Sequence, residues 1–121
     1  MKVFVYFNLH KKCWSVKALE GKNKGKVIAH CETIILKDCQ LKVSESGRQR
    51  VIREQKKYVH AGVVGLVVSM DKKVKDTDTL VTYNPYRFNS FVKKETMEPV
   101  FNANKAYMSA KKGEGAKVYI S

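Results

Sequence analysis

The stretch AGVVGLVVSM, residues 61–70, constrains the fold more than any other part of the sequence. It is a nearly continuous apolar run, rich in valine and shorter than the roughly 20 residues that a membrane-spanning helix needs. Such a run is typical of a central β-strand that is paired on both sides and buried on both faces. Its two glycines, Gly62 and Gly65, predict the close approach of another backbone or of a ligand. The rest of the chain must therefore supply neighbouring strands.

Segments rich in β-branched and aromatic residues occur on both sides of this central strand. Residues 3–9 and 13–19 are separated by a three-residue link and predict a hairpin. Residues 26–38 predict a long strand with a bulge near Glu32, which ends in a turn at Asp38. Further strands are predicted at residues 40–45, 80–92, 106–110 and 117–121.

The hydrophobic period changes at Ser44, where apolar residues begin to recur at helical spacing. Val51, Ile52 and Tyr58 would face the core, and Ser44 or Ser46 would serve as the N-cap. This pattern predicts one principal α-helix over about residues 45–57. The expected fold class is α+β, a mainly antiparallel β-sheet meander with this helix packed against it, in a single domain of residues 1–121.

The charge balance points to anionic partners. Twenty-four basic residues against eleven acidic ones give a formal net charge of +13, which favours nucleic acid, nucleotides or anionic membrane surfaces. The alternative is that the lysines only solvate the surface, since they are spread along the whole chain. Charge alone leaves both interpretations open.

The cysteines and the apolar segments predict a cytoplasmic protein with no membrane partner. Cys13, Cys31 and Cys39 are an odd number without a CxxC pair, which argues against a disulfide framework and a zinc knuckle. A zinc site that includes His30 and Cys39 is a minor alternative to simple packing. The apolar run at the N-terminus is too short for a secretory signal.

Motifs for catalysis are missing from the sequence. We find no phosphate-binding GxxxxGK[ST], no GxGxxG before a helix, no HExxH and no GxSxG. The acidic residues are few, and no pair has a spacing that indicates general acid and base catalysis. We therefore expect no enzyme activity, no catalytic residue, no metal site and no cofactor.

Arginine is concentrated in one segment. The chain has four arginines among its twenty-four basic residues, and Arg48, Arg50 and Arg53 lie within six positions. The planar guanidinium group holds phosphate and carboxylate oxygens in a bidentate manner, which lysine does not. A helix N-terminus in the same segment would add backbone N–H groups for an anion. The alternative is that Arg50 and Arg53 pair with Glu54 and Glu45 on a solvated face.

The remaining arginine lies in a second candidate segment, TYNPYRFNSF, residues 82–91. Aromatic side chains stack on bases, amides contact base edges or hydroxyls, and arginine binds phosphate, so this mixture suits a nucleotide. The alternative is a strand whose aromatic residues fill the core. The candidate ligand-binding residues of this segment are Tyr83, Asn84, Tyr86, Arg87, Phe88, Asn89 and Phe91.

Three long stretches carry a resemblance to a known family. VYFNLHKKCWSV, KVSESGRQRVIREQKKYVHAGVVG and VTYNPYRFNSFVKKETMEPVFNA together resemble the phage type 1 Thoeris anti-defence family, over most of the chain. Members of that family bind and sequester cyclic ADP-ribose isomers made by bacterial TIR-domain enzymes without cleaving them. Some also bind cyclic oligonucleotides at a separate site.

The resemblance implies a phage protein that acts in the cytoplasm of the infected host. It implies a nucleotide-binding domain that sequesters a cyclic ADP-ribose isomer such as gcADPR and so blocks activation of the Thoeris effector. It also implies a homo-oligomer, either a dimer or an assembly of dimers. Two other functions stay open: a basic nucleic-acid-binding phage protein, whose binding would weaken steeply with salt, and a factor whose basic face covers an acidic host enzyme.

Overall fold

The computed structural model describes residues 1–8, 11–43, 61–70, 79–82, 90–110 and 116–121. Within these ranges the chain forms ten β-strands in one antiparallel sheet and contains no helix. The expected α+β class is therefore wrong, because the described part of the protein is all β. The helix predicted over residues 45–57 falls outside the described residues.

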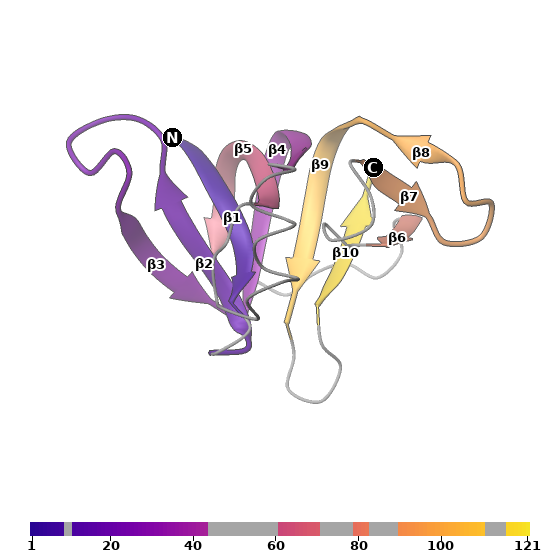
Figure 1. The fold of residues 1–121 in the computed structure, drawn as a ribbon, viewed down its shortest axis with the longest axis horizontal. Helices are drawn as coiled ribbons and strands as arrows, with labels where there is room; N and C mark the ends of the chain where they lie inside the picture. Colours follow the sequence, from indigo (N-terminus) through magenta and orange to yellow (C-terminus); the bar gives the residue numbers. More distant parts are fainter. Residues whose placement is uncertain (9–10, 44–60, 71–78, 83–89, 111–115) are drawn as a thin grey trace.

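The sheet has the strand order β3-β2-β1-β5-β4-β9-β10-β6-β7-β8 (Figure 1). The predicted hairpin near the N-terminus is confirmed by β1 and β2, and the predicted final pair of strands by β9 and β10. No helix in the described ranges is long and apolar enough to cross a membrane. The strands are β1 (Lys2–Asn8), β2 (Cys13–Ala18), β3 (Val27–Cys31), β4 (Thr33–Val43), β5 (Ala61–Met70), β6 (Thr79–Thr82), β7 (Phe91–Lys93), β8 (Pro99–Val100), β9 (Asn102–Ser109) and β10 (Lys117–Ile120).

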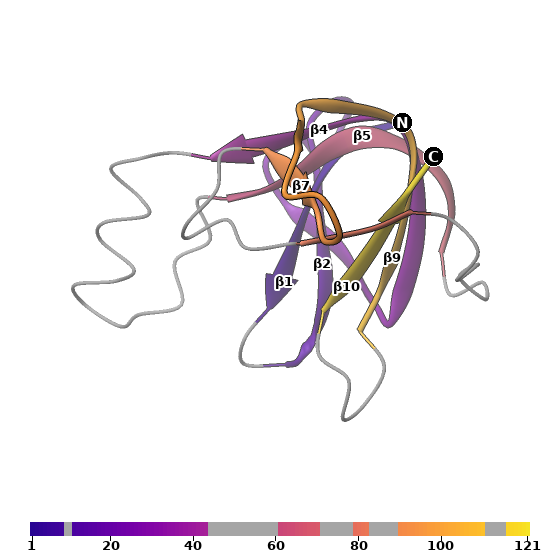
Figure 2. The same ribbon diagram turned by 90° about the vertical axis from the view of Figure 1, so that its right-hand side faces the viewer.

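The connection between β3 and β4 shows that the sheet curls. Only Glu32 separates these strands in sequence, although β2, β1 and β5 lie between them in the sheet. Four strand spacings in a flat sheet would hold them about 19 Å apart, whereas two residue steps reach at most about 7 Å. The sheet must bend until the end of β3 meets the start of β4, and Figure 2 shows the rounded profile. The single strand predicted over residues 26–38 is therefore wrong, because the chain ends β3 at Cys31 and begins β4, on the far side of β5 in the sheet, at Thr33.

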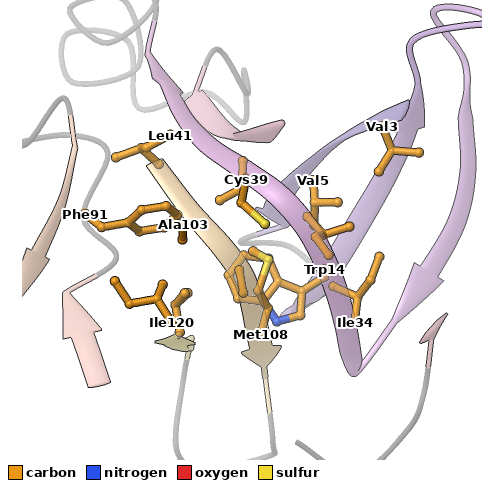
Figure 3. Close-up of a cluster of buried hydrophobic side chains, with 14 of the residues drawn as sticks. Val3, Val5, Trp14, Ile34, Cys39, Leu41, Phe91, Ala103, Met108 and Ile120 are labelled. Atoms are coloured by element: carbon orange, nitrogen blue, oxygen red, sulfur yellow. The ribbon is translucent and has the colours of Figure 1, made fainter. Parts of the chain in front are cut away.

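The concave face of the curled sheet holds one continuous hydrophobic core. Trp14 of β2 is fully buried and lies beside Ile34 of β4 and Met108 of β9, so residues far apart in the strand order meet (Figure 3). Strands β2 and β4, which are not neighbours in the sheet, also contact each other. A sheet that curls around its own apolar face needs no helical layer to cover that face. This is why the described core is built from strands alone.

The central strand β5 occupies the interior position that its sequence predicts, between β1 and β4. A Cβ atom at Gly62 would clash with the carbonyl oxygen of Val5, and one at Gly65 would lie 3.0 Å from the carbonyl oxygen of Lys37. Both glycines therefore permit the predicted close approach of neighbouring backbone. Burial on both faces is wrong at Val68, which is 49% exposed.

Strand β4 is continuous where the sequence predicts a turn. Residue Asp38 lies inside the strand with a φ of +51°, and the register between β4 and β5 shifts between Lys37 and Gln40. Such a shift with one residue in the left-handed region is a β-bulge, which bends the strand without ending it. Residues 40–43 of the separate strand predicted over residues 40–45 are therefore part of β4, and residues 44–45 lie outside the described residues.

Candidate functional site

Nine of the ten candidate ligand-binding residues lie outside the described part of the chain. Arg48, Arg50 and Arg53 fall in residues 44–60, and the other six fall in residues 83–89. Their assignment as ligand-binding residues therefore stays a prediction. The nine residues are Arg48, Arg50, Arg53, Tyr83, Asn84, Tyr86, Arg87, Phe88 and Asn89.

Phe91 is the one candidate that the structure describes. Its side chain is fully buried at the start of β7, in the part of the core that also contains Leu41 and Ala103 (Figure 3). A ring enclosed in this way presents no face to a ligand. Phe91 therefore packs in the core, which is the alternative to ligand binding that its sequence also allows.

The two arginine-bearing segments are attached to the sheet at neighbouring points. Residues 44–60 follow β4 three positions after Leu41, and residues 83–89 end two positions before Phe91. Leu41 and Phe91 belong to the same region of the core, although they lie in distant parts of the sequence. The sequence alone contains no signal for this proximity, because it depends on how the sheet curls.

A corner in β4 and β9 brings polar side chains together on the outside of the sheet. At the Asp38 bulge, the alternation of core-facing and outward-facing residues shifts by one position. Two consecutive residues of each strand therefore face outward there. The core-facing residues are Ile34, Leu36, Cys39 and Leu41 on β4, and Ala103, Ala106 and Met108 on β9. We call the exposed residues at this corner the polar patch: Lys37, Asp38, Gln40, Asn102, Asn104 and Lys105.

A hollow of about 320 Å³ adjoins the polar patch and shares two asparagines with it. It lies beside the first residues of β9, which have β4 as their ladder partner, whereas the last bridge between β9 and β10 joins Ala106 to Ile120. The volume lies at the lower end of the range for small-molecule sites. The hollow is lined by Lys93, Val100, Asn102, Asn104, Ile120 and Ser121.

The polar patch carries two lysines and one aspartate, and the hollow adds a third lysine. Lys37 and Lys105 occupy directly opposite positions on β4 and β9, and like charges in such positions destabilise each other. The Lys93 Nζ lies 4.0 Å from an Oε2 of Glu98, and both side chains are largely exposed. A pair of this kind is weak because water screens it. A bound anion would relieve the repulsion between Lys37 and Lys105 and would compete readily with Glu98 for Lys93.

The side chains of the hollow and the polar patch can bind polar and anionic groups. Asparagine amides donate and accept hydrogen bonds, and lysine ammonium groups bind anionic oxygens. The described residues contain no group of three His, Cys, Asp or Glu side chains that could hold a metal ion. These residue types suit a ligand that carries phosphates together with hydroxyls or base edges.

Cys39 lies under the corner with its side chain in the core. Burial raises the pKa of its thiol to about 12, with a backbone hydrogen bond from Ala106 lowering it and the charge of Asp38 raising it further. The thiol therefore stays protonated near neutral pH, which disfavours both nucleophilic attack and metal binding. His30 is exposed on β3, so the minor alternative of a zinc site with Cys39 gains no support.

Sequence reasoning missed the polar patch. The stretch FNANK, residues 101–105, interleaves an aromatic residue, two amides and a lysine in the same way as residues 82–91. That mixture of residue types could have indicated the β9 part of the polar patch. The β4 residues of the patch could not be predicted from the sequence, because their position depends on the bulge at Asp38 and on the pairing of β4 with β9.

Comparison with known proteins places the chain in a phage family. A family profile described as Mycobacterium phage L5 gene 82 protein matches residues 1–116. The chain belongs to this family. The gene 82 protein of Mycobacterium phage L5 is 39% identical over 115 residues, which cover 90% of this chain and 90% of that protein. No solved structure matches the chain.

Membership of the gene 82 protein family confirms that the protein is a phage protein. The finer resemblance, to the type 1 Thoeris anti-defence family, stays a prediction. The same holds for the cyclic nucleotide ligand and the homo-oligomer that the resemblance implies.

Proposed function

We propose that this phage protein binds a cyclic ADP-ribose isomer such as gcADPR and retains it without cleavage, which keeps the signal from its effector. The observation that carries the proposal is the polar hollow beside the start of β9, where amides and lysines meet on an exposed corner. The resemblance to the Thoeris anti-defence family supplies the class of ligand. The phage family and the net charge of +13 agree with it.

Each part of such a ligand has a counterpart near the hollow. Lys93 and Lys105 supply positive charge for a pyrophosphate, and Asn102 and Asn104 supply donors and acceptors for ribose hydroxyls and base edges. Phe101 precedes Asn102 in sequence and is 62% exposed, so its ring offers a face for stacking. Arg48, Arg50, Arg53 and Arg87 remain part of the proposal as additional phosphate ligands.

The test is recovery of an intact ligand. The purified protein is incubated with the product pool of an activated Thoeris TIR enzyme, washed and denatured by heat, and the released small molecules are analysed by mass spectrometry. We expect a cyclic ADP-ribose isomer of unchanged mass in near-stoichiometric amount. Release of a cleaved product would contradict retention without catalysis, and recovery of nothing would contradict the proposal as a whole.

A matched pair of variants locates the site. Asn102→Ala combined with Asn104→Ala removes both amides from the hollow, and we expect the affinity for the ligand to fall about thirtyfold, since each of the two lost hydrogen bonds weakens binding by about 1 kcal/mol. Asn23→Ala changes an exposed asparagine in the β2–β3 loop and should leave retention unchanged. Equal retention by all three proteins would place the site elsewhere.

A basic nucleic-acid-binding phage protein is the second candidate. It is favoured by Lys22, Lys24 and Lys26, which are exposed in the β2–β3 loop, well away from β9. Contacts with a phosphate backbone would make affinity fall steeply as salt rises. Binding of DNA or RNA with such a slope, together with no recovery of cyclic ADP-ribose, would favour this candidate.

A further inference from the structure

A chain of three polar side chains crosses β1, β2 and β3. These strands lie on the other side of the molecule from β7 and β10 (Figure 1). Ser15 and His30 are direct partners in the β2–β3 ladder, and the Ser15 Oγ lies 2.9 Å from the His30 Nδ1. Asn8, at the end of β1, places its Nδ2 3.1 Å from the same Oγ. These two contacts join the β1–β2 turn to β3, which is an outermost strand of the described sheet.

The direction of the hydrogen bonds is set in the β1–β2 turn. The backbone N–H of Lys11 can only donate, and it lies 3.0 Å from the side-chain oxygen of Asn8. This contact fixes which end of the Asn8 amide is the oxygen. The amide nitrogen therefore points to Ser15 and donates to its Oγ.

The hydroxyl group of Ser15 connects the Asn8 amide to the His30 imidazole. The side chain of Ser15 is fully buried, and its hydroxyl group has a single hydrogen to donate. A buried hydroxyl hydrogen needs an acceptor, and the His30 Nδ1 lies 2.9 Å from the Oγ, so the arrangement that satisfies this hydrogen has Ser15 donating to the His30 Nδ1. A neutral imidazole whose Nδ1 accepts a hydrogen bond carries its proton on Nε2.

We infer that Asn8 and Ser15 are positioning residues that hold His30 as a fixed hydrogen-bond donor for an anionic oxygen, of which a phosphate oxygen is the expected class. The Nδ1 is engaged by a buried group, and the side chain of His30 is exposed, so the Nε2–H is the group left for a ligand. This site is separate from the hollow on β9 and does not depend on the function proposed for it.

The protonation pattern of His30 provides a first test. In 15N NMR spectra of the isotopically labelled protein, recorded where the imidazole is neutral, we expect His30 to carry its proton on Nε2. Asn8→Asp keeps an oxygen for the Lys11 N–H but removes the donor to Ser15. The Ser15 hydroxyl then donates to the introduced carboxylate and accepts from His30, which places a proton on Nδ1.

Two further variants serve as controls. Asn23→Asp makes the same chemical change in the exposed β2–β3 loop and should leave the His30 signals where they are. Ser15→Ala removes the link and should change the Nδ1 shift without moving a proton onto it. The backbone amide signals of the same samples report whether each variant is folded. An Asn8→Asp variant that is folded and keeps the wild-type His30 signals would overturn the directed chain.

Titration with inorganic phosphate tests the donor. We expect the Nε2–H signal of His30 to shift in a saturable way in the wild-type protein and to shift much less in Asn8→Asp. A wild-type signal that stays constant on addition of phosphate would overturn the assignment of His30 as a site for an anionic oxygen, whatever its protonation pattern.

Discussion

The two halves of β9 differ sharply although they belong to one continuous strand. Residues 106–109 are all buried, whereas Asn102, Asn104 and Lys105 are exposed. The first group lies between β4 and β10, and the second extends past the last bridge to β10. A strand flanked on both sides contributes to the core, and the same strand with one flank uncovered becomes available for binding.

Because of this difference, side chains in the exposed half of β9 can vary with function at little cost in stability. In the buried half, each side chain contacts others from several strands, so a change there is felt through the whole core. In the exposed half, the backbone is held by β4 while the side chains of Asn102, Asn104 and Lys105 face solvent. The polar patch and the hollow lie in that half.

The largest expected effect contrasts the two halves directly. Met108→Ala removes a fully buried side chain beside Trp14 and should lower the free energy of unfolding by about 2–5 kcal/mol, because it leaves a cavity. Asn104→Ala, four positions away, should change it by less than about 0.5 kcal/mol. Urea denaturation of both variants measures this. Similar losses of unfolding free energy in the two variants would contradict the difference between the two halves of β9.

The next effect concerns the tight packing at the centre of the sheet. Gly62→Ala would bring a methyl group against the Val5 carbonyl oxygen and the Phe4 ring, and we expect a loss of about 1–3 kcal/mol from overpacking. Gly65→Ala meets its nearest atoms at 3.0 Å and 3.2 Å and should cost less. Thermal unfolding of both variants gives the order. A larger loss at Gly65 would contradict the close approach of β1 and β5.

A smaller effect is expected at high pH from Cys39, under the corner. Burial raises the pKa of its thiol from 9.0 to about 12, so the unfolded chain releases this proton at lower pH than the folded protein. The stability due to this group is complete below pH 9.0 and decreases as pH rises towards 12. Cys39→Ala should show a shallower decrease than the wild type over that interval, since it lacks the thiol.

Because wild type and Cys39→Ala share every other side chain, the quantity to compare is the difference between their two slopes of stability against pH, measured by chemical denaturation. A constant offset between wild type and Cys39→Ala is expected from the lost side-chain volume. Parallel curves, differing only by that offset, would show that Cys39 titrates alike in the folded and unfolded chains.

The smallest effect on stability should come from the hollow itself. The double variant Asn102→Ala with Asn104→Ala should unfold within about 1 kcal/mol of the wild type, since both residues are exposed surface positions. Its retention of nucleotide should nevertheless decrease, which separates binding from folding. A double variant that loses stability together with retention would mean that these asparagines hold the end of β9 in place.

Much of the strand content could be predicted from sequence. The β-branched and aromatic residues of 3–9 and the alternation in 13–19 predicted the first hairpin, and the apolar run at 61–70 predicted an interior strand with two glycines at close approach. These predictions succeed because they depend on the period of side chains along one strand and on the volume of one residue.

The wrong predictions concern residues whose structure depends on pairing and packing with distant strands. Asp38 looks like a turn residue in sequence, but pairing of β4 with both β5 and β9 carries the strand through it as a bulge. The aromatic residue Phe91 fits a ligand site or a core equally well, and only the curl of the sheet encloses it with Leu41. The α+β class failed for the same reason, since a curled sheet covers its own apolar face.

The sequence by itself determined that this is a basic, strand-rich chain without a recognisable catalytic motif. Those properties depend on composition and on neighbours along the chain. The tertiary structure alone decided that Asn102 and Asn104 share a corner with Lys37, and that β9 extends past β10 to leave a hollow. Both outcomes depend on how distant strands pair and curl, which is set by the burial of the whole apolar face and not by any local pattern.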